Sequence, residues 1–324
     1  MRSLWGRLLS AGAVIASSLA LVACWHGRRA DHVAVAIVDW PAYEYLYLAS
    51  QVGLDRSEGY TLKVKQFGSL RDQRMAYQRG DLEVIATTLP EALAICRDVP
   101  SRCPLLVLVL DQSDGADQIY GSSSLSSMAA LKGQRVGLEP GILGEFMLMR
   151  ALQKVGLPLT AVQRVYAPPR ALVSQLMAGD LAAIVTYNPY SEALQQSDRW
   201  RLLFSSRDVP GEVVDVLAVS PELKRRDPSL VNKLISTWWS ARRYAATHSR
   251  DALALMAQRQ GITPADFQRQ EQGIAYPDRA DQARLLAPDG PIQAALERLR
   301  QQMRAADRLP PDLALPRLER PAQR

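Results

Sequence analysis

Short apolar runs alternate with amphipathic helical runs from Val33 onward, and this alternation constrains the fold more than any other feature of the chain. The runs 33–38, 62–66 and 84–86 have the length and composition of strands, and the segments 43–51 and 71–79 have the apolar spacing of helices. The run 105–110 is almost continuously apolar, which is typical of a buried parallel strand. The pattern therefore predicts an α/β fold on mostly parallel sheets.

A second round of the same alternation follows. It predicts strands over 135–138, 162–166 and 182–186 and helices over 144–155 and 172–178, the helices being closed by Gly156 and Gly179. Two such sets in series predict two lobes, which suits a mature chain of about 300 residues. The run 213–219 predicts one more strand, and the pattern is then helical almost to the end. A proline-rich tail from Pro310 is expected to wrap the surface or fray.

The N-terminus has the pattern of a bacterial lipoprotein signal. Arg2 and Arg7 precede the uncharged run 8–21, which is too short for a spanning helix, and Leu21-Val22-Ala23-Cys24 follows it. Cleavage before Cys24 would leave residues 1–23 as signal peptide and 24–32 as a lipidated tether on the outer face of a membrane. The alternative is a buried cysteine after an ordinary signal peptide.

Charge and cysteine content narrow the class further. The formal charge of +6 includes Arg2 and Arg7, so the mature chain carries about +4. Arginines of the C-terminal third, among them Arg242, Arg300 and Arg308, alternate with acidic and amide residues, which indicates solvated helix faces rather than a nucleic-acid surface.

Besides Cys24 the chain has two cysteines, Cys96 and Cys103, close together in sequence. In an exported chain they are a disulfide candidate, with two separate thiols as the alternative. The three histidines, at 26, 32 and 248, form no metal-ligand cluster, and no cofactor is expected.

Six stretches, taken in order, resemble the periplasmic substrate-binding proteins of ABC importers for nitrate, taurine, alkanesulfonates and thiamine precursors. They are DWPAYEYLYLASQVGL (39–54), FGSLRDQRMAYQRGDLEVIATTLPEAL (67–93), LDQSDGADQI (110–119), LKGQRVGLEPGILGEFMLMRALQKVGL (131–157), MAGDLAAIVTYNPY (177–190) and VLAVSPEL (216–223). The similarity runs on to LALPRL (313–318) and covers nearly the whole mature chain.

This resemblance implies a type II periplasmic-binding-protein fold, with a small-molecule ligand in a cleft between two lobes. Lobe 1 would comprise residues 33–115 and 212–324, with the C-terminal helices, and lobe 2 residues 116–211. Two crossing segments, near 110–117 and 208–215, would allow hinge closure over the ligand. Ligands of open α/β sheets bind at the carboxyl ends of strands, where the matching loops fall. The protein is expected to be a monomer.

Candidate ligand-binding residues in lobe 1 follow its strands. Trp40 and Tyr43 come after the first strand and could wall the cleft, or could pack on neighbouring loops. Ser69 opens a helix in a Gly-Ser turn, where it could hold a ligand oxygen, cap the helix, or do both. Thr87 and Thr88 repeat that arrangement after the third strand.

In lobe 2 the turn Glu139-Pro140-Gly141 stands where the family often contacts ligand, and Gly141 would permit close backbone approach. Glu139 and Glu145 place negative charge at a helix N-terminus, which could satisfy the helix dipole alone. Tyr187 and Asn188 stand where the family commonly has a Trp-Glu pair, so the aromatic wall is kept and the carboxylate is replaced.

Several charged and aromatic residues leave the choice between binding and structure open. Asp39, Asp114 and Asp215 lie at strand ends or crossings and could bind ligand or form hinge hydrogen bonds. Arg170 is the best-placed cation of lobe 2, unless it is a solvated helix start. The remaining candidates, in the helical C-terminal region, are expected to pack between helices or to lie at the surface: Trp238, Trp239 and His248.

Three functions compete. The resemblance favours a lipoprotein that delivers a small molecule to an ABC permease, and a partner that is a membrane-bound sensor is the alternative. An enzyme like the yeast-type thiamine pyrimidine synthases would need a histidine and a cysteine-rich motif that this chain lacks. Because acidic residues outnumber Arg170 around the expected cleft, the ligand is predicted to be neutral, zwitterionic or amine-bearing rather than nitrate-like.

Overall fold

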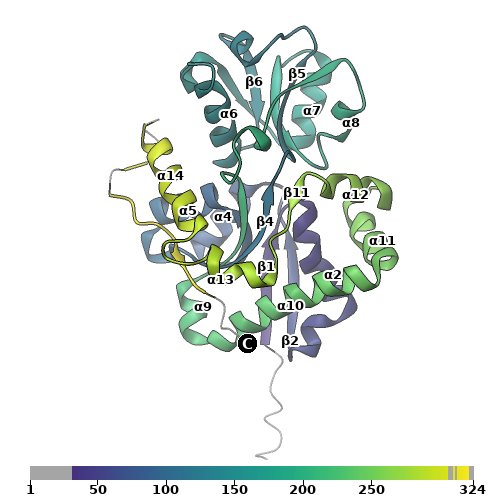
Figure 1. The fold of residues 1–324 in the computed structure, drawn as a ribbon, viewed down its shortest axis with the longest axis vertical. Coiled ribbons are helices and arrows are strands. Elements are labelled where there is room, and N and C mark those ends of the chain that lie inside the picture. The colour runs from purple at the N-terminus through teal and green to yellow at the C-terminus, as the bar shows by residue number, and fades with distance from the viewer. Residues whose placement is uncertain (1–30, 306–308, 311, 321–324) are drawn as a thin grey trace, which may run out of the picture.

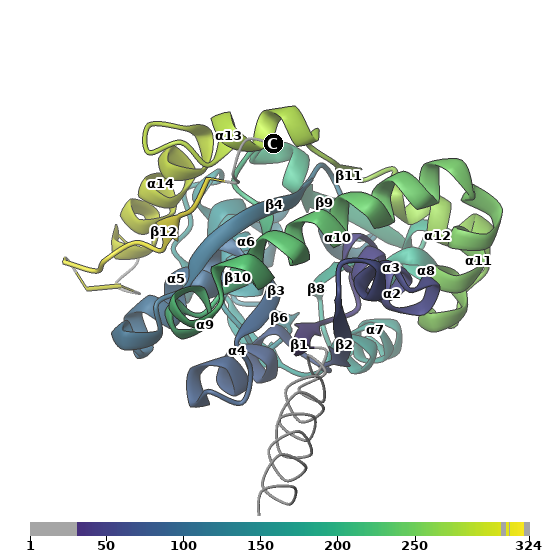
Figure 2. The same cartoon turned by 90° about the horizontal axis from the view of Figure 1, so that it is seen from below.

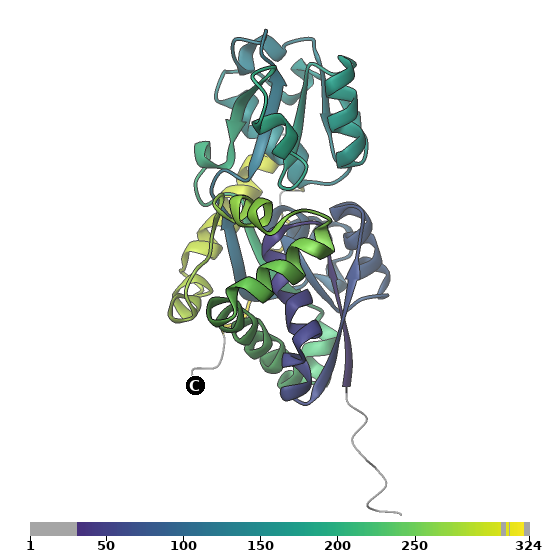
Figure 3. The same ribbon diagram turned by 90° about the vertical axis from the view of Figure 1, so that its right-hand side faces the viewer.

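The computed structural model describes residues 31–305, 309–310 and 312–320. Cys24, the signal peptide and most of the expected tether lie outside the described residues, as does Arg308, while the first strand begins at Asp31, two residues before the expected start. None of the described helices is both long and apolar enough to cross a bilayer. Figures 1 and 3 show two bodies stacked along the long axis of the molecule, each built on its own sheet.

The first sheet runs in the order β11-β4-β10-β3-β1-β2, with β12 paired to β4. Its β1 is parallel to β2 and β3, whereas β10 is antiparallel to both β3 and β4. All residues of β3 and β10 are buried, because helices cover both faces of the sheet. The strands are β1 (Asp31–Ile37), β2 (Tyr60–Gln66), β3 (Val84–Thr88), β4 (Leu105–Ser113), β10 (Val214–Val219), β11 (Ile274–Ala275) and β12 (Arg317–Leu318).

In the described part of the chain ten α-helices accompany this sheet, and we call the sheet with these helices lobe 1. Figure 2 shows α2, α3, α11 and α12 grouped at one side and α4, α5, α9 and α14 at the other. Their bounds are α2 (Glu44–Val52), α3 (Leu54–Ser57), α4 (Leu70–Arg79), α5 (Leu89–Asp98), α9 (Pro221–Arg226), α10 (Pro228–Thr247), α11 (Ser249–Gln260), α12 (Pro264–Glu271), α13 (Gln282–Leu285) and α14 (Pro291–Ala305).

The second sheet runs in the order β7-β6-β8-β5-β9, and with its helices we call it lobe 2. Strands β6, β7 and β8 pair in parallel, and β5 is antiparallel to its neighbours β8 and β9. The elements are β5 (Asp117–Ser122), β6 (Arg135–Leu138), α6 (Leu143–Gln153), β7 (Gln163–Tyr166), α7 (Pro169–Ala178), β8 (Ala183–Tyr187), α8 (Glu192–Gln195) and β9 (Trp200–Ser205). The chain crosses between the lobes from β4 to β5 and from β9 to β10.

The prediction that β4 is a parallel strand is wrong. It pairs antiparallel with β10 and β11 and parallel only with the two-residue β12. An unbroken apolar run reports burial of both faces of a strand, which this strand has, but it carries no information on the direction of the neighbours. The pairing of β12 with β4 also shows that the described part of the proline-rich tail lies along lobe 1.

Strands β5 and β9 were not expected. The sequence of β5, DQIYGS, is polar at both ends and reads as part of a crossing and a loop, yet it lies between β8 and β9. Its first residue, Asp117, is buried, so this end of β5 faces the interior and not solvent.

Two arginines of the C-terminal helices are not simply solvated. Arg242 is half-buried, with its guanidinium carbon 4.7 Å from the ring centre of Tyr45 and 3.8 Å from that of Tyr276. Arg300 is half-buried and donates to the carbonyl oxygen of Leu313 at 3.2 Å. Their alternation with acidic residues hid these contacts, because stacking on aromatic rings leaves no mark in a charge pattern.

Packing of the tryptophan pair follows the prediction. Trp238 is 1% exposed and meets the Tyr45 ring edge-on at 5.6 Å between centroids, and Trp239 is half-buried against the core. His248 lies at the surface, stacked on Tyr244.

A disulfide joins Cys96, near the end of α5, to Cys103, just before β4, as the cysteine pairing predicted. The two Cα atoms are 4.2 Å apart. Both elements reach the region between the lobes, since β4 leads into a crossing segment and α5 begins beside lobe 2.

Candidate functional site

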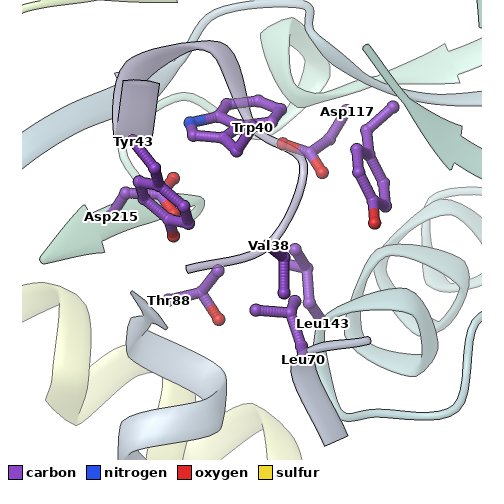
Figure 4. Close-up of a pocket in the computed structure, with 9 residues that line it drawn as sticks. Val38, Trp40, Tyr43, Leu70, Thr88, Asp117, Leu143 and Asp215 are labelled. Carbon is purple, nitrogen blue, oxygen red and sulfur yellow. The ribbon is translucent and has the colours of Figure 1, made fainter. Parts of the chain in front are cut away.

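Two small adjoining cavities lie between the lobes. Each has a volume of about 20 Å³, roughly the space of one or two water molecules. They share four lining residues: Leu70, Asp117, Leu143 and Tyr187. The first is completed by Val38, Trp40, Tyr43, Thr88 and Asp215, which Figure 4 shows around one space, and the second by Glu139, Pro140, Gly141, Gly144 and Val185.

Aromatic rings from both lobes form one wall. Trp40 lies three residues after the end of β1 and precedes a short 3-10 helix (Pro41–Tyr43), which begins at Pro41 and ends at the buried Tyr43. Tyr187 ends β8 in the other lobe, and its ring meets that of Trp40 edge-on at 6.1 Å between centroids. All three predicted aromatic candidates therefore lie together at the cavity, and Trp40 and Tyr43 also pack in the core.

Two carboxyl groups lie beneath these rings, where β4 and β10 run side by side. Asp111 and Asp215 are cross-strand partners whose carboxyl groups hydrogen-bond to each other. Trp40 Nε1 donates to Asp111 at 3.3 Å, and the Tyr43 hydroxyl donates to Asp215. Burial raises the pKa of Asp111 to about 8, and burial together with the charge of Asp111 raises the pKa of Asp215 well above its usual range. The pair therefore holds protons at neutral pH.

Asp117 is the third buried carboxyl group, at the start of β5 where the chain enters lobe 2. It is 4% exposed and lines both cavities, and Figure 4 shows its carboxyl group beside Trp40. Burial raises its pKa to about 6, and a hydrogen bond with Ser113 opposes the rise. At pH 7 it is thus mostly ionised, and no described residue forms an ion pair with it.

Glu139 joins the lobes at the second cavity. It follows β6, and its two oxygens accept from the backbone N–H of Leu70, the first residue of α4, at 2.9 Å and from the hydroxyl of Tyr187 at 2.8 Å. Burial raises its pKa to about 7. The carboxyl group of lobe 2 thus occupies the N-terminus of a lobe 1 helix.

Glu91 makes the opposite contact. It lies in the first turn of α5, and its Oε1 accepts from the backbone N–H of Ile142 at the start of α6, while its Oε2 lies 2.7 Å from Arg74 Nε. A Cβ atom on Gly141 would come within 2.8 Å of Glu91 Oε1, so glycine at this position permits the approach. Each lobe therefore places a carboxylate on a helix start of the other.

The rim carries further contacts between the lobes. Asp39, after β1, accepts from the Tyr190 hydroxyl at 2.5 Å and from Gln66. Within lobe 2, Arg170 lies over the ring of Tyr190, with its guanidinium carbon 5.4 Å from the centroid. Asn188 donates to the backbone oxygen of Gln270 at 3.2 Å. These three predicted residues lie outside both cavities.

The predicted hydroxyl residues have separate placements. Ser69 caps α4 by accepting from the N–H of Asp72 at 3.0 Å, and Thr88 caps α5 through the N–H of Glu91 while also lining the first cavity. Thr87 is fully buried one residue earlier in β3 and lines neither cavity.

Two acidic candidates line neither of these two cavities. Asp114 is exposed on the crossing segment, 3.5 Å from Arg207, and Glu145 pairs with Arg164 at 3.0 Å on lobe 2. The dipole interpretation of Glu145 agrees with its place in the first turn of α6.

Sequence reasoning missed four polar residues of this region: Asp111, Asp117, Glu91 and Tyr190. The first two stand in the stretch LDQSDGADQI, directly after the apolar run of β4, and that position was the available signal. Among the described residues no group of histidine, cysteine and acidic side chains could hold a metal ion.

The sequence matches a family model and several known proteins. The model of the NMT1-like family matches residues 28–260. A Brucella abortus protein described as a binding protein is 26% identical over 178 residues, which is 54% of each chain. An aliphatic sulfonates-binding protein of Escherichia coli is 24% identical over 170 residues, 48% of this chain and 53% of that one. The chain thus spans about half the length of the curated relatives it matches.

Solved structures resemble nearly the whole chain. The alkanesulfonate-binding protein SsuA from Xanthomonas axonopodis pv. citri, bound to MOPS, has a TM-score of 0.73 at 19% identity and covers 88% of this chain and 96% of its own. The desulfurization enzyme DSZB has a TM-score of 0.61 at 19% identity, covering 88% and 95%. These identities show the fold alone, and they confirm the predicted two-lobed periplasmic-binding-protein fold.

Proposed function

The chain belongs to the NMT1-like family, and from this membership and the geometry of the cleft we propose that it is an extracytoplasmic solute-binding lipoprotein. It captures a small organic molecule between its lobes and delivers it to an ABC importer. The observation that carries the proposal is the cleft itself, which is lined from both lobes and bridged by Glu139 and Glu91. Such a site opens and closes as the lobes move about the two crossing segments.

The ligand of the proposed protein is neutral, zwitterionic or amine-bearing. Acidic side chains line the cavities, namely Asp117, Glu139 and Asp215, and no lysine, arginine or histidine is among the described lining residues. Burying a free anion beside these carboxyl groups would cost several kcal/mol. We therefore do not propose a sulfonate, the ligand that the names of some relatives give, as the ligand of this chain.

We propose that the protein binds its ligand and does not catalyse a reaction on it, although a desulfurization enzyme shares the fold. The two cysteines of the described residues are joined in the disulfide, so neither offers a thiol nucleophile. A membrane-bound sensor in place of the permease is the alternative partner, and an adjacent sensor-kinase gene instead of permease and ATPase genes would favour it.

Anchoring through Cys24 after removal of residues 1–23 would place the protein on a membrane in the periplasm. We further propose that it acts as a monomer, with residues 33–115 and 212–324 in one lobe and 116–211 in the other.

A thermal-shift screen of the mature chain tests the function. The panel contains amines, amino acids, neutral pyrimidines, carboxylates, sulfonates and nitrate. A true ligand at about a hundred times its dissociation constant adds roughly 2.7 kcal/mol of stability. Stabilisation by one organic class supports solute binding, and the absence of any stabilising compound, together with turnover of a sulfinate, would replace the proposal with an enzyme.

A further inference from the structure

We propose that the cavity between Trp40, Tyr43 and Tyr187 is a subsite for an organic ammonium ion, with Asp117 as the counter-charge. The inference rests on the proposed solute-binding function and names the ligand group that this part of the cleft receives. Three properties of the cavity carry it: the distribution of charge, the aromatic walls and the size.

Among the buried carboxyl groups, Asp117 carries the charge. The pair Asp111 and Asp215 keeps its protons at neutral pH and is already engaged, since Trp40 and Tyr43 donate to it. Asp117 has a pKa of about 6 and hydrogen-bonds with Ser113, so at pH 7 it is an anion in a site that is almost closed to solvent. A buried carboxylate without an ion-pair partner among the described residues is a strong binding group for a cation.

The aromatic walls of the cavity also favour a cation. Trp40, Tyr43 and Tyr187 line the same cavity as Asp117, and the negative faces of aromatic rings attract cations. The N–H and O–H donors of these three residues already donate to Asp111, Asp215 and Glu139, so they are not free to bind an anion. Three further lining residues, Val38, Leu70 and Leu143, are aliphatic and would contact an alkyl chain, and the other two are the polar Thr88 and Asp215.

Size selects among ammonium ions. A volume of about 20 Å³ accommodates a group as large as a water molecule, which is the size of a primary ammonium group. Asp117, Leu70, Leu143 and Tyr187 are shared with the second cavity, so an alkyl chain can extend along these residues toward Glu139. The favoured ligand is a primary amine with a short apolar chain.

Isothermal titration calorimetry of the mature chain with n-butylamine and 1,4-diaminobutane tests the subsite, with ethanesulfonate and n-butanol as probes of the opposite charge and of no charge. At least one amine should bind, and neither of the other probes should bind as tightly. Asp117→Asn should weaken amine binding at least tenfold, the loss of one charge-assisted contact. The control Asp114→Asn, on the exposed part of the same crossing segment, should bind like wild type.

A pH series on the wild type keeps the test independent of whether the variant folds. Affinity for the amine should fall below about pH 6 as Asp117 is protonated. Equal affinity of wild type and folded Asp117→Asn, or tighter binding of ethanesulfonate than of both amines, would overturn the subsite. If the amines fail while another class stabilises the protein in the screen, the subsite is wrong and solute binding stands; if no class binds, both are wrong.

Discussion

The stability of this protein should depend on pH through the buried pair Asp111 and Asp215, and replacing Asp111 with Asn should remove one proton from that dependence. Asp111 has a folded-state pKa of about 8, against an ordinary value of 3.8 in the unfolded chain. Its folded-state pKa is raised, so its stabilising contribution is complete below pH 3.8 and is lost as the pH rises toward 8. Each proton held in this way changes the free energy of unfolding by about 1.4 kcal/mol per pH unit.

Asparagine preserves the contacts that a protonated carboxyl group makes. Its oxygen can accept from Trp40 Nε1, and its amide can donate to Asp215, so the pair stays satisfied without a titrating group at position 111. Between pH 5 and pH 7 the wild type should lose about 3 kcal/mol more stability than Asp111→Asn. The variant gains in relative stability as the pH rises.

Urea denaturation followed by tryptophan fluorescence, at pH 5, 6 and 7, measures both slopes. Asp114→Asn is the matched control, because Asp114 is exposed three residues further along the chain. Its curve should run parallel to that of the wild type. If the curve of Asp111→Asn is also parallel, Asp111 does not hold a proton in the folded state, and the account of the paired carboxyl groups is refuted.

Three further outcomes are expected. Gly141→Ala should hold the lobes apart, because its Cβ would approach Glu91 Oε1 to 2.8 Å, and small-angle X-ray scattering should show a larger radius of gyration than for the wild type; an unchanged radius would contradict this. The double change Cys96→Ser and Cys103→Ser should lower the free energy of unfolding by about 2 to 3 kcal/mol, as the chain entropy of so short a loop allows, and chemical denaturation checks it; no loss would show that the disulfide does not form. Cys24→Ser should release the exported protein from membranes, and its persistence in the membrane fraction would exclude the lipid anchor.

Periodicity predicted most strands and helices because each element carries its own apolar pattern. Strand β6 spans Arg135–Leu138, as expected, and Gly179 ends α7, as expected. The direction of neighbouring strands could not be predicted, because a strand buried on both faces has the same composition whether its neighbours are parallel or antiparallel. Strand β5 was missed because polar residues at both of its ends interrupt the apolar run, and Asp117 at its first position lies at the cavities.

For the site, residues that directly follow strands were accessible to prediction, and Trp40, Glu139 and Tyr187 lie at the cavities. Asp111 directly follows the apolar run 105–110 and was missed all the same, because β4 continues to Ser113 and its carboxyl group is tolerated there only through its partner on β10. Glu91 was missed because its partner, the N–H of Ile142, is 51 residues away in the other lobe. Such pairs arise from the docking of two lobes, which no local pattern encodes.

Glu139 and Glu91 each contact the start of a helix in the other lobe, and these contacts bear on how far the sequence around them can vary among relatives. In both contacts the donor is a backbone N–H, at Leu70 and at Ile142, and every residue except proline supplies one. The side chains at positions 70 and 142 can therefore differ between homologous proteins without loss of the contact. Two glutamates, with a glycine before the second helix start, form a signature by which members of the family that close in this way can be recognised from their genes.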